Sequence, residues 1–562
     1  MSRTSRLCLK ELEPQLGKQV SLSGWVSFVR KAKEVTFVGL RDGENHPDLL
    51  QIVVPNNQVD GLKLEDVVSV SGVLEQRPKG FEIKPTTLVV ENRCQHPLPL
   101  NIKLATNEVQ TPQQRDNSLR YRYLDLRIRP HLQRNLHIRG TAALAMRNLL
   151  TETEGFLEVE TPTLFKSTPE GAREFLVPVA SESIPKFYAL VQSPQQYKQM
   201  LMVGGIDRYF QFARCYRDEG GRADRQPEFT QLDMEMAFVN QCEHVQLAVE
   251  KVVCAGWIAA YNKYPQVVPL PPQLNQRFYE IPLERALQEY GSDKPNLSFG
   301  MKIESGKQIT AMGLAVSLSK KEKSDLIRQV TTLAGVLVKD VDFTQTGHVV
   351  VNALELNKLG KARLVLHEWM LYKQIPISPG ELPLHEPFWV TDFNLFECDE
   401  NGMISSTHHP FTSPHPDDLS KLQQVLEDIR NGRDPDKIRL TKLRALHYDL
   451  VCDGVELGGG SIRIHNSKLQ EQVLRDALGI SQQDCRLQFS HLLDALALGA
   501  PPHGGFALGF DRFVSMLCGA GSLSDTLAFP KSSTGTDPLT GAPCVLTETQ
   551  SNVLQRLALR GV

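Results

Sequence analysis

The sequence is 562 residues long, and 41% of its residues are hydrophobic and 23% charged. This ordinary globular composition and length predict about three or four domains. A formal net charge of -3 excludes attraction of nucleic acid by the whole protein, so any nucleic-acid surface must be a local patch. The ten cysteines form no CxxC pair, which argues against a zinc ribbon and a disulfide scaffold. No apolar run approaches the roughly 18 residues of a membrane span and no secretory segment is recognisable, so we expect a soluble protein without a membrane partner.

Short β-rich runs recur between Val20 and Val90, separated by Gly, Pro, Asn and Asp residues. Five such runs in about 75 residues predict a small barrel of the OB-fold type, which we place at residues 1–104. Another small all-β module is the alternative. Residues 105–130 are rich in Pro, Gln and Arg, and we interpret them as a hinge.

A helix with one apolar face is predicted after the hinge, and strands and loops then alternate with helices to about residue 290. Residues 296–385 have fewer Gly and more Lys, Leu and Val than their flanks, which indicates an insertion. The predicted fold class is therefore multidomain α+β. It comprises a catalytic domain in two parts, residues 131–295 and 386–530, an inserted domain at 296–385 and a C-terminal tail at 531–562.

Residues 208–238 contain two alternating runs joined by a polar loop with two glycines and a proline, which predicts an antiparallel hairpin with one buried and one polar face. Arg217 and Glu219 share a face of the first run. A solvated surface is the common interpretation of such alternation, but Phe229 among the charged groups favours a binding site. The second run places Leu232, Met234, Met236 and Phe238 on the apolar face, and Phe229, Gln231, Asp233 and Glu235 on the polar face.

Residues 447–464 contain the turn signal Asp453-Gly454, which predicts a second hairpin. This turn pairs Val451 with Glu456 and makes Asp449 and Glu456 diagonal neighbours on one face. Two such carboxylates repel each other unless a cation lies between them, and Mg²⁺ favours carboxylates together with substrate phosphates. A pair of exposed acids beside a hairpin is the alternative.

A third element, GAPPHGGFALGFDRF, places glycines before Asp511-Arg512, which alone is a weak signal. Taken together, the three elements resemble the motifs of class II aminoacyl-tRNA synthetases. The resemblance implies that Arg217 and Arg512 are catalytic and bind the α- and γ-phosphates of ATP, and that Asp449 and Glu456 hold Mg²⁺. The ATP-binding residues that it implies are Arg217, Asp218, Glu219, Gln226, Phe229, Glu456, Gly509, Phe510, Asp511 and Arg512.

The segments STPEGAREFLVP, QSPQQYKQMLM and STHHPFTSP are similar to those of aspartyl-tRNA synthetases of the bacterial and mitochondrial type. The similarity implies that Glu170 and Asp233 face the substrate ammonium group, and that Lys198 and Arg463 face its side-chain carboxylate. Neutral asparagine is then rejected because buried cations are left unpaired. The implied aspartate site comprises Glu170, Ser193, Gln195, Lys198, Arg217, Gln231, Asp233, His408, His409 and Arg463.

The N-terminal barrel fits the anticodon-binding OB-fold of this subclass, which implies contacts with the tRNA anticodon by Arg30, Phe37 and Gln51. Aromatic stacking and hydrogen bonding to base edges are how proteins recognise single-stranded RNA loops. A barrel core position is the alternative for Phe37. The predicted helical segment of residues 131–155 and the following FLEVETPTL resemble the element that forms the class II homodimer interface.

These resemblances predict ATP-dependent attachment of L-aspartate to its tRNA through aspartyl-adenylate. The alternatives are an asparaginyl enzyme, a relaxed enzyme that charges both aspartate and asparagine tRNAs, and a catalytically inactive RNA-binding paralogue. Arg3, Arg6 and Lys10 without an acid weakly resemble a transit peptide. We therefore expect the mitochondrial matrix, with a bacterial cytoplasm as the alternative.

Overall fold

The computed structural model describes residues 12–41, 50–59, 61–78, 80–100, 111–167, 172–179, 186–220, 224–272, 276–433, 437–545 and 547–548. The chain divides into two compact units. The first comprises Met1–His137 and Ser524–Cys544, and the second comprises Ile138–Leu523 and Val545–Val562. Among the described residues, no helix is long and apolar enough to cross a membrane.

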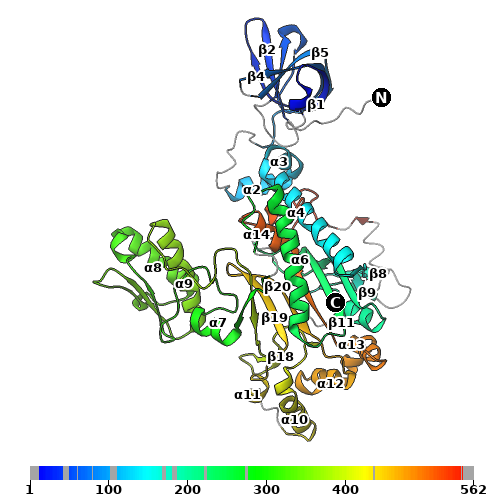
Figure 1. Cartoon of the computed structure of the whole chain (residues 1–562), viewed down its shortest axis with the longest axis vertical. Helices are drawn as coiled ribbons and strands as arrows, with labels where there is room; N and C mark the ends of the chain where they lie inside the picture. Colours follow the sequence, from blue (N-terminus) through cyan, green and yellow to red (C-terminus); the bar gives the residue numbers. More distant parts are fainter. Residues whose placement is uncertain are drawn as a thin grey trace. The chain divides into compact units, whose positions relative to one another are not determined.

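A closed five-stranded barrel belongs to the first unit (Figure 1). Its strand order is β1-β2-β3-β5-β4, and alternate side chains of each strand fill the interior, as the period of two in the sequence requires. The predicted OB-fold barrel is therefore confirmed. Its strands are β1 (Gln19–Lys31), β2 (Val35–Arg41), β3 (Leu50–Pro55), β4 (Val67–Arg77) and β5 (Gly80–Asn92).

The described part of the predicted hinge, from residue 111 onward, forms helices α2 (Pro112–Arg120) and α3 (Arg122–Ile128). Thr111 begins α2 with a capping box, in which its hydroxyl accepts from the N–H of Gln114. The buried Arg122 donates to the backbone carbonyls of Ser524, Leu527 and Ala528. These bonds hold the C-terminal segment of this unit against α3.

An eight-stranded, largely antiparallel sheet organises the second unit, with the order β12-β16-β19-β20-β21-β11-β10-β6. Only the pairs β12–β16 and β10–β6 are parallel. The predicted antiparallel catalytic sheet is thus confirmed. Its strands are β6 (Leu157–Glu158), β10 (Arg208–Tyr216), β11 (Glu228–Ala237), β12 (Tyr279–Pro282), β16 (Phe388–Thr391), β19 (His447–Cys452), β20 (Val455–Ile462) and β21 (His503–Gly509).

One face of this sheet is apolar and packs against helices α4 (Pro130–Asn148), α6 (Cys242–Lys263) and α14 (Phe510–Leu517) (Figure 1). Leu232, Met234 and Met236 of β11 enter this core, as predicted. The prediction that Phe238 joins them is wrong. Strand β11 ends at Ala237, and Phe238 adopts a positive φ of 60° and is 73% exposed.

Smaller elements surround the sheet. They are β7 (Leu164–Phe165), β8 (Leu176–Val179), β9 (Lys186–Leu190), α5 (Gln195–Val203), α7 (Leu283–Tyr290), β17 (Phe396–Cys398), β18 (Ile404–Ser406), α10 (Leu419–Arg430), α11 (Lys437–Leu440), α12 (Ser467–Gln472) and α13 (Gln482–Ala497).

The inserted region, whose fold the sequence left open, has an apolar core of its own. A three-stranded antiparallel sheet, in the order β13-β15-β14, packs there with two helices. The buried guanidinium of Arg363 donates to three backbone carbonyls, those of Asn296, Phe299 and Met301. The elements are β13 (Gln308–Ala311), α8 (Lys320–Ala334), β14 (Val341–Phe343), β15 (Val349–Asn352) and α9 (Leu356–Tyr372).

Candidate active site

A cavity of about 370 Å³ opens over the polar face of β11, β20 and β21, opposite the apolar core. The N-terminal turn of α5, the loop after β18 and the first turn of α14 complete its wall. The cavity brings together most residues of the predicted ATP and aspartate sites. They are Ser193, Gln195, Lys198, Arg217, Glu219, Gln226, Phe229, Gln231, Asp233, His408, His409, Asp449, Glu456, Arg463, Gly509, Asp511 and Arg512.

Several predicted residues do not line this cavity. Phe510 is buried in the apolar core, where its ring meets that of Phe212 edge-on at 5.0 Å. The carboxylate of Asp218 lies 3.7 Å from the guanidinium of Arg173 instead. Glu170 lies outside the described residues.

The three predicted anticodon residues belong to the barrel of the first unit. Arg30 of β1 pairs directly with Phe37 of β2, and both lie away from the barrel interior, which Val38 enters. Gln51 of β3 pairs with Gly39, so it shares the outer face with Phe37. Phe37 is therefore not a barrel core residue.

Four buried charged groups form one cluster at the base of the cavity. The Lys198 ammonium lies 2.9 Å from Asp233 Oδ1 and 3.2 Å from Glu235 Oε2. The Arg463 guanidinium donates from Nε to Glu235 Oε1 at 3.0 Å and from Nη1 to Ser461 Oγ at 2.7 Å. The charges of the two cations and the two carboxylates cancel, which makes burial of the cluster possible.

Burial raises the pKa of Asp233, although Lys198 opposes this shift. Burial acts on Glu235 in the same direction, but Arg463 and Lys198 together hold the pKa of Glu235 below its usual value. Glu235 is therefore the carboxylate that both cations share in the absence of substrate.

Among the described residues, the buried polar atoms around the cavity that have no hydrogen-bond partner include Asp233 Oδ2, Arg217 Nε and His409 Nε2. Such atoms are costly to bury unless a ligand or water satisfies them. Asp233 offers an acceptor suited to an ammonium group, and Arg217 offers a donor suited to a phosphate. The Arg217 guanidinium lies over the Phe229 ring, 5.1 Å from its centre, which leaves a cation and an aromatic face together.

Strand β10 ends at Tyr216, so Arg217 and Glu219 follow the strand instead of alternating within it, as the sequence had predicted. The N–H of Arg217 still donates to the carbonyl of Pro227 at 2.9 Å. Glu219 pairs with Arg225 at 2.9 Å. The hairpin loop thereby presents the side chains of both residues to the cavity.

The β19–β20 hairpin begins with the predicted register, in which Cys452 pairs with Val455 and Val451 with Glu456. A bulge then shifts the register by one residue, so that Asp449 faces Gly459. Asp449 and Glu456 both line the cavity, but they are not the diagonal neighbours of a regular ladder.

Glycines in the third and second motifs make room for carboxylates. A side chain at Gly505 would place its Cβ 1.8 Å from Glu235 Oε2, and one at Gly459 would lie 2.5 Å from Asp449 Oδ1. Both carboxylates therefore lie against the backbone of a neighbouring strand. The glycines therefore serve this packing.

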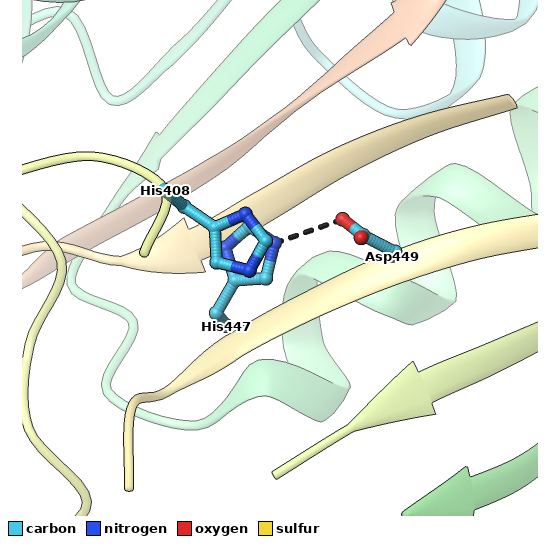
Figure 2. A group of neighbouring side chains, drawn as sticks. All are labelled: His408, His447 and Asp449. Carbon is cyan, nitrogen blue, oxygen red and sulfur yellow. Dashed lines mark hydrogen bonds and ion pairs between the residues drawn. The ribbon is translucent and has the colours of Figure 1, made fainter. Parts of the chain in front are cut away.

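His447 and His408 stack face to face beside Asp449 (Figure 2). The ring centres are 3.5 Å apart and the planes differ by 9°, while His447 Nε2 lies 2.8 Å from Asp449 Oδ1. Burial, with help from the charge of Arg463, lowers the pKa of His447 to about 3, so the ring is neutral and donates its one N–H to the carboxylate.

These three residues offer nitrogen and oxygen atoms within 4.8 Å of one another, as in a metal site. An imidazole binds a metal ion in the plane of its ring. Because the two rings lie in parallel planes 3.5 Å apart, no single ion can lie in both planes. The arrangement instead orients Asp449 and leaves its second oxygen available.

Glu456 and Arg512 also line the cavity. Arg512 Nη1 donates to the carbonyl of Glu456 at 3.1 Å, and the Lys294 ammonium lies 3.7 Å from Glu456 Oε2. Asp511 accepts from the N–H of Thr230 at 3.0 Å and pairs with Arg139 at 2.6 Å, so its carboxylate joins α14 to β11.

Sequence reasoning assigned no role to Glu235, His447 or Lys294. Glu235 carried a detectable signal, because the alternation of β11 places it on the same face as Asp233. His408, on which His447 stacks, and Glu456, which Lys294 approaches, come from distant segments of the chain, and no local pattern identifies them.

The comparisons with known proteins identify the family. Residues 114–533 match the family of tRNA synthetases class II (D, K and N), and residues 20–91 match the OB-fold nucleic acid binding domain. The chain belongs to the class II tRNA synthetases of this group.

The mitochondrial aspartate–tRNA ligase of Bos taurus is 38% identical to this chain, over 94% of this chain and 86% of the relative. The aspartate–tRNA(Asp/Asn) ligase of Aquifex aeolicus is also 38% identical, over 96% of each chain. A putative aspartyl-tRNA synthetase from Leishmania major Friedlin shares the fold, with a TM-score of 0.60 at 19% identity over 94% of each chain.

Asp449→Asn should stabilise the second unit at pH 7.5. Burial raises the pKa of Asp449 from 3.8 to about 6, so the ionised carboxylate destabilises the fold above pH 6, and this cost disappears as the pH falls through 6 toward 4. We expect a gain of about 2–3 kcal/mol at pH 7.5 and a smaller gain at pH 5. Calorimetric scans of the wild-type and variant proteins at pH 7.5 and pH 5 measure this gain in stability. Equal gains at the two pH values would contradict the raised pKa of Asp449.

Proposed function

We propose that this protein attaches L-aspartate to its tRNA in an ATP-dependent reaction that passes through aspartyl-adenylate. The observation that carries the proposal is the buried cluster of Lys198, Asp233, Glu235 and Arg463, which lines the same cavity as Arg217 through all its members except Glu235. A charged amino acid suits this cluster, and a nucleoside triphosphate suits the arginines beside it. Membership of the family and the two aspartate–tRNA ligase relatives support it.

In the proposed amino-acid site, the substrate ammonium group meets the unpartnered Asp233 Oδ2. The side-chain carboxylate meets Arg463 and Lys198, which then divide their charge between the substrate and Glu235. His408 and His409 cover the site from the loop after β18, and Ser193, Gln195 and Gln231 complete its lining. Glu170 stays a prediction from the sequence.

In the proposed ATP site, Arg217 binds the α-phosphate and Phe229 stacks on adenine, with Glu219 and Gln226 beside it. Arg512, Gly509 and Glu456, which also line the cavity, would bind the remaining phosphates. Asp449 and Glu456 suit Mg²⁺, because both are carboxylates facing the cavity and Asp449 keeps one oxygen free of His447. When bound there, Mg²⁺ neutralises phosphate charge.

The proposed first step is attack by the aspartate α-carboxylate on the α-phosphate, which forms aspartyl-adenylate and releases pyrophosphate. Arg217 stabilises the negative charge that builds on the α-phosphate, and Arg512 orients the departing pyrophosphate. The terminal ribose hydroxyl of tRNA then takes the aspartyl group and releases AMP. The protein contributes mainly positioning and charge stabilisation.

We propose that the barrel binds the tRNA anticodon through its outer face. Arg30 and Phe37 are cross-strand neighbours there, which combines a cation with a half-buried aromatic ring. Gln51 donates to Glu82 and accepts from Arg77, so its amide is held in one orientation. Stacking on an aromatic ring and hydrogen bonding to base edges suit single-stranded RNA.

A homodimer is proposed because apolar side chains remain exposed where the eight-stranded sheet ends. Leu157 of the edge strand β6 is 53% exposed, and Leu144 of α4 is 60% exposed. Large apolar side chains clustered at an unpaired strand edge favour association.

The mitochondrial relatives support a mitochondrial matrix location, and a bacterial cytoplasm is the alternative because the Aquifex aeolicus relative is equally similar. A fluorescent fusion that fails to reach mitochondria would contradict the proposed location.

Charging assays with purified aspartate and asparagine tRNAs test the substrate. We expect aspartate on aspartate tRNA, because the buried cations suit a second carboxylate. Aspartate on both tRNAs would identify the relaxed enzyme, as the Aquifex aeolicus name suggests for that relative. Asparagine on asparagine tRNA alone, or no charging at all, would refute the proposal.

Arg217→Ala should lower aspartate-dependent ATP–pyrophosphate exchange by about a hundredfold or more, because it removes the cation at the α-phosphate. Arg214→Ala is the matched control. Arg214 lies in the same strand region but is exposed, pairs with Glu228 and does not line the cavity. Equal rates for Arg217→Ala and Arg214→Ala would show that the site is wrongly assigned.

Replacing Leu144 and Leu157 together by Glu should convert the dimer into monomers of 62.9 kDa, because charges are then buried at the interface. Sedimentation equilibrium measures the mass. Leu333→Glu with Leu371→Glu, two similarly exposed leucines of the inserted region, is the control and should stay dimeric. A wild-type monomer would contradict the dimer.

A further inference from the structure

His447 contacts two parts of the cavity that serve different substrates in the proposed reaction. The edge of its ring donates from Nε2 to Asp449 Oδ1 at 2.8 Å (Figure 2). The face of the same ring stacks on His408, which belongs to the loop after β18. One rigid ring therefore contacts both Asp449, which belongs to the proposed site of ATP and its metal ion, and His408, which belongs to the proposed aspartate site.

The surroundings fix this ring in place. Phe393, itself 2% exposed, meets His447 edge-on at 5.0 Å and His408 edge-on at 4.7 Å. His447 starts β19, which the sheet holds between β16 and β20. Movement of the His408 loop must therefore either carry the His447 ring with it or break the stack.

We propose that His447 is a positioning residue that couples binding of aspartate to binding of ATP with its metal ion. It does so because its ring edge orients Asp449 while its ring face holds His408. The inference rests on the proposed function and deepens it. By linkage, each substrate must then increase the affinity for the other by the same factor.

Two variants separate the two contacts. His447→Phe keeps an aromatic face for His408 but loses the N–H that Asp449 accepts. His447→Gln keeps an amide N–H at about the position of Nε2 but loses the ring. Losing a hydrogen bond to a charged group should raise the half-saturating Mg²⁺ concentration about tenfold in His447→Phe. Losing the stack should raise the aspartate KM about threefold to tenfold in His447→Gln.

The coupling itself is measured by titrating aspartate with and without a non-hydrolysable ATP analogue and Mg²⁺. We expect wild-type protein to bind aspartate more tightly with the analogue, and both variants to lose most of that gain. His367→Phe is the matched control, because His367 stacks on Phe299 at 3.7 Å and 9° in the inserted region, away from the cavity. It should behave as wild type.

The outcomes are distinguishable. No coupling in the wild-type protein, or coupling that survives in both variants, would overturn the inference. The inference would also be overturned if the half-saturating Mg²⁺ concentration and the aspartate KM rose equally in both variants, since that result indicates general loss of structure. Absence of aspartate-dependent exchange in the wild-type protein would instead refute the proposed function.

Discussion

The balance of four buried charges constrains the rest of the site. Lys198 comes from α5, Asp233 and Glu235 from β11, and Arg463 from the residue after β20. Removing one member leaves a buried charge without a partner, which costs far more than an exposed ion pair contributes. The helix and the two strands must therefore keep their relative positions, and Gly505 must stay without a side chain so that Glu235 fits between the strands.

The same balance changes the explanation of amino-acid selectivity. The sequence suggested that Lys198 and Arg463 have no partner before the substrate carboxylate binds, so that a neutral substrate leaves both cations unpaired. Glu235 already pairs with both cations. A neutral substrate then leaves no cation without a partner, so its binding is penalised less than it would be if Lys198 and Arg463 were both unpaired. Selectivity therefore depends on how favourably the substrate carboxylate shares these two cations with Glu235. The unpartnered Asp233 Oδ2 favours a substrate ammonium group in either case.

Local patterns in the sequence predicted the barrel and the polar face of β11, because alternation and turn residues act over a few positions. The resemblance to the family implied most of the other residues around the cavity. Local patterns failed where distant segments decide the structure. The register shift between Leu450 and Val451 and the stacking of His447 on His408 depend on partners that local patterns do not show. Phe238 was misplaced because the chain reverses at a positive φ just beyond Ala237.

The inserted region acts on the cavity through its two ends. At its entry, a side chain at Gly454 of the β19–β20 turn would contact Asn296 and the carbonyl of Lys294, whose ammonium approaches Glu456. At its exit, His385 donates its N–H to Asp453 at 3.0 Å. Both ends thus hold the hairpin that carries Asp449 and Glu456. Because these contacts lie at the two ends of the inserted region, the positions of Asp449 and Glu456 depend on the contacts and not on the length of the inserted region.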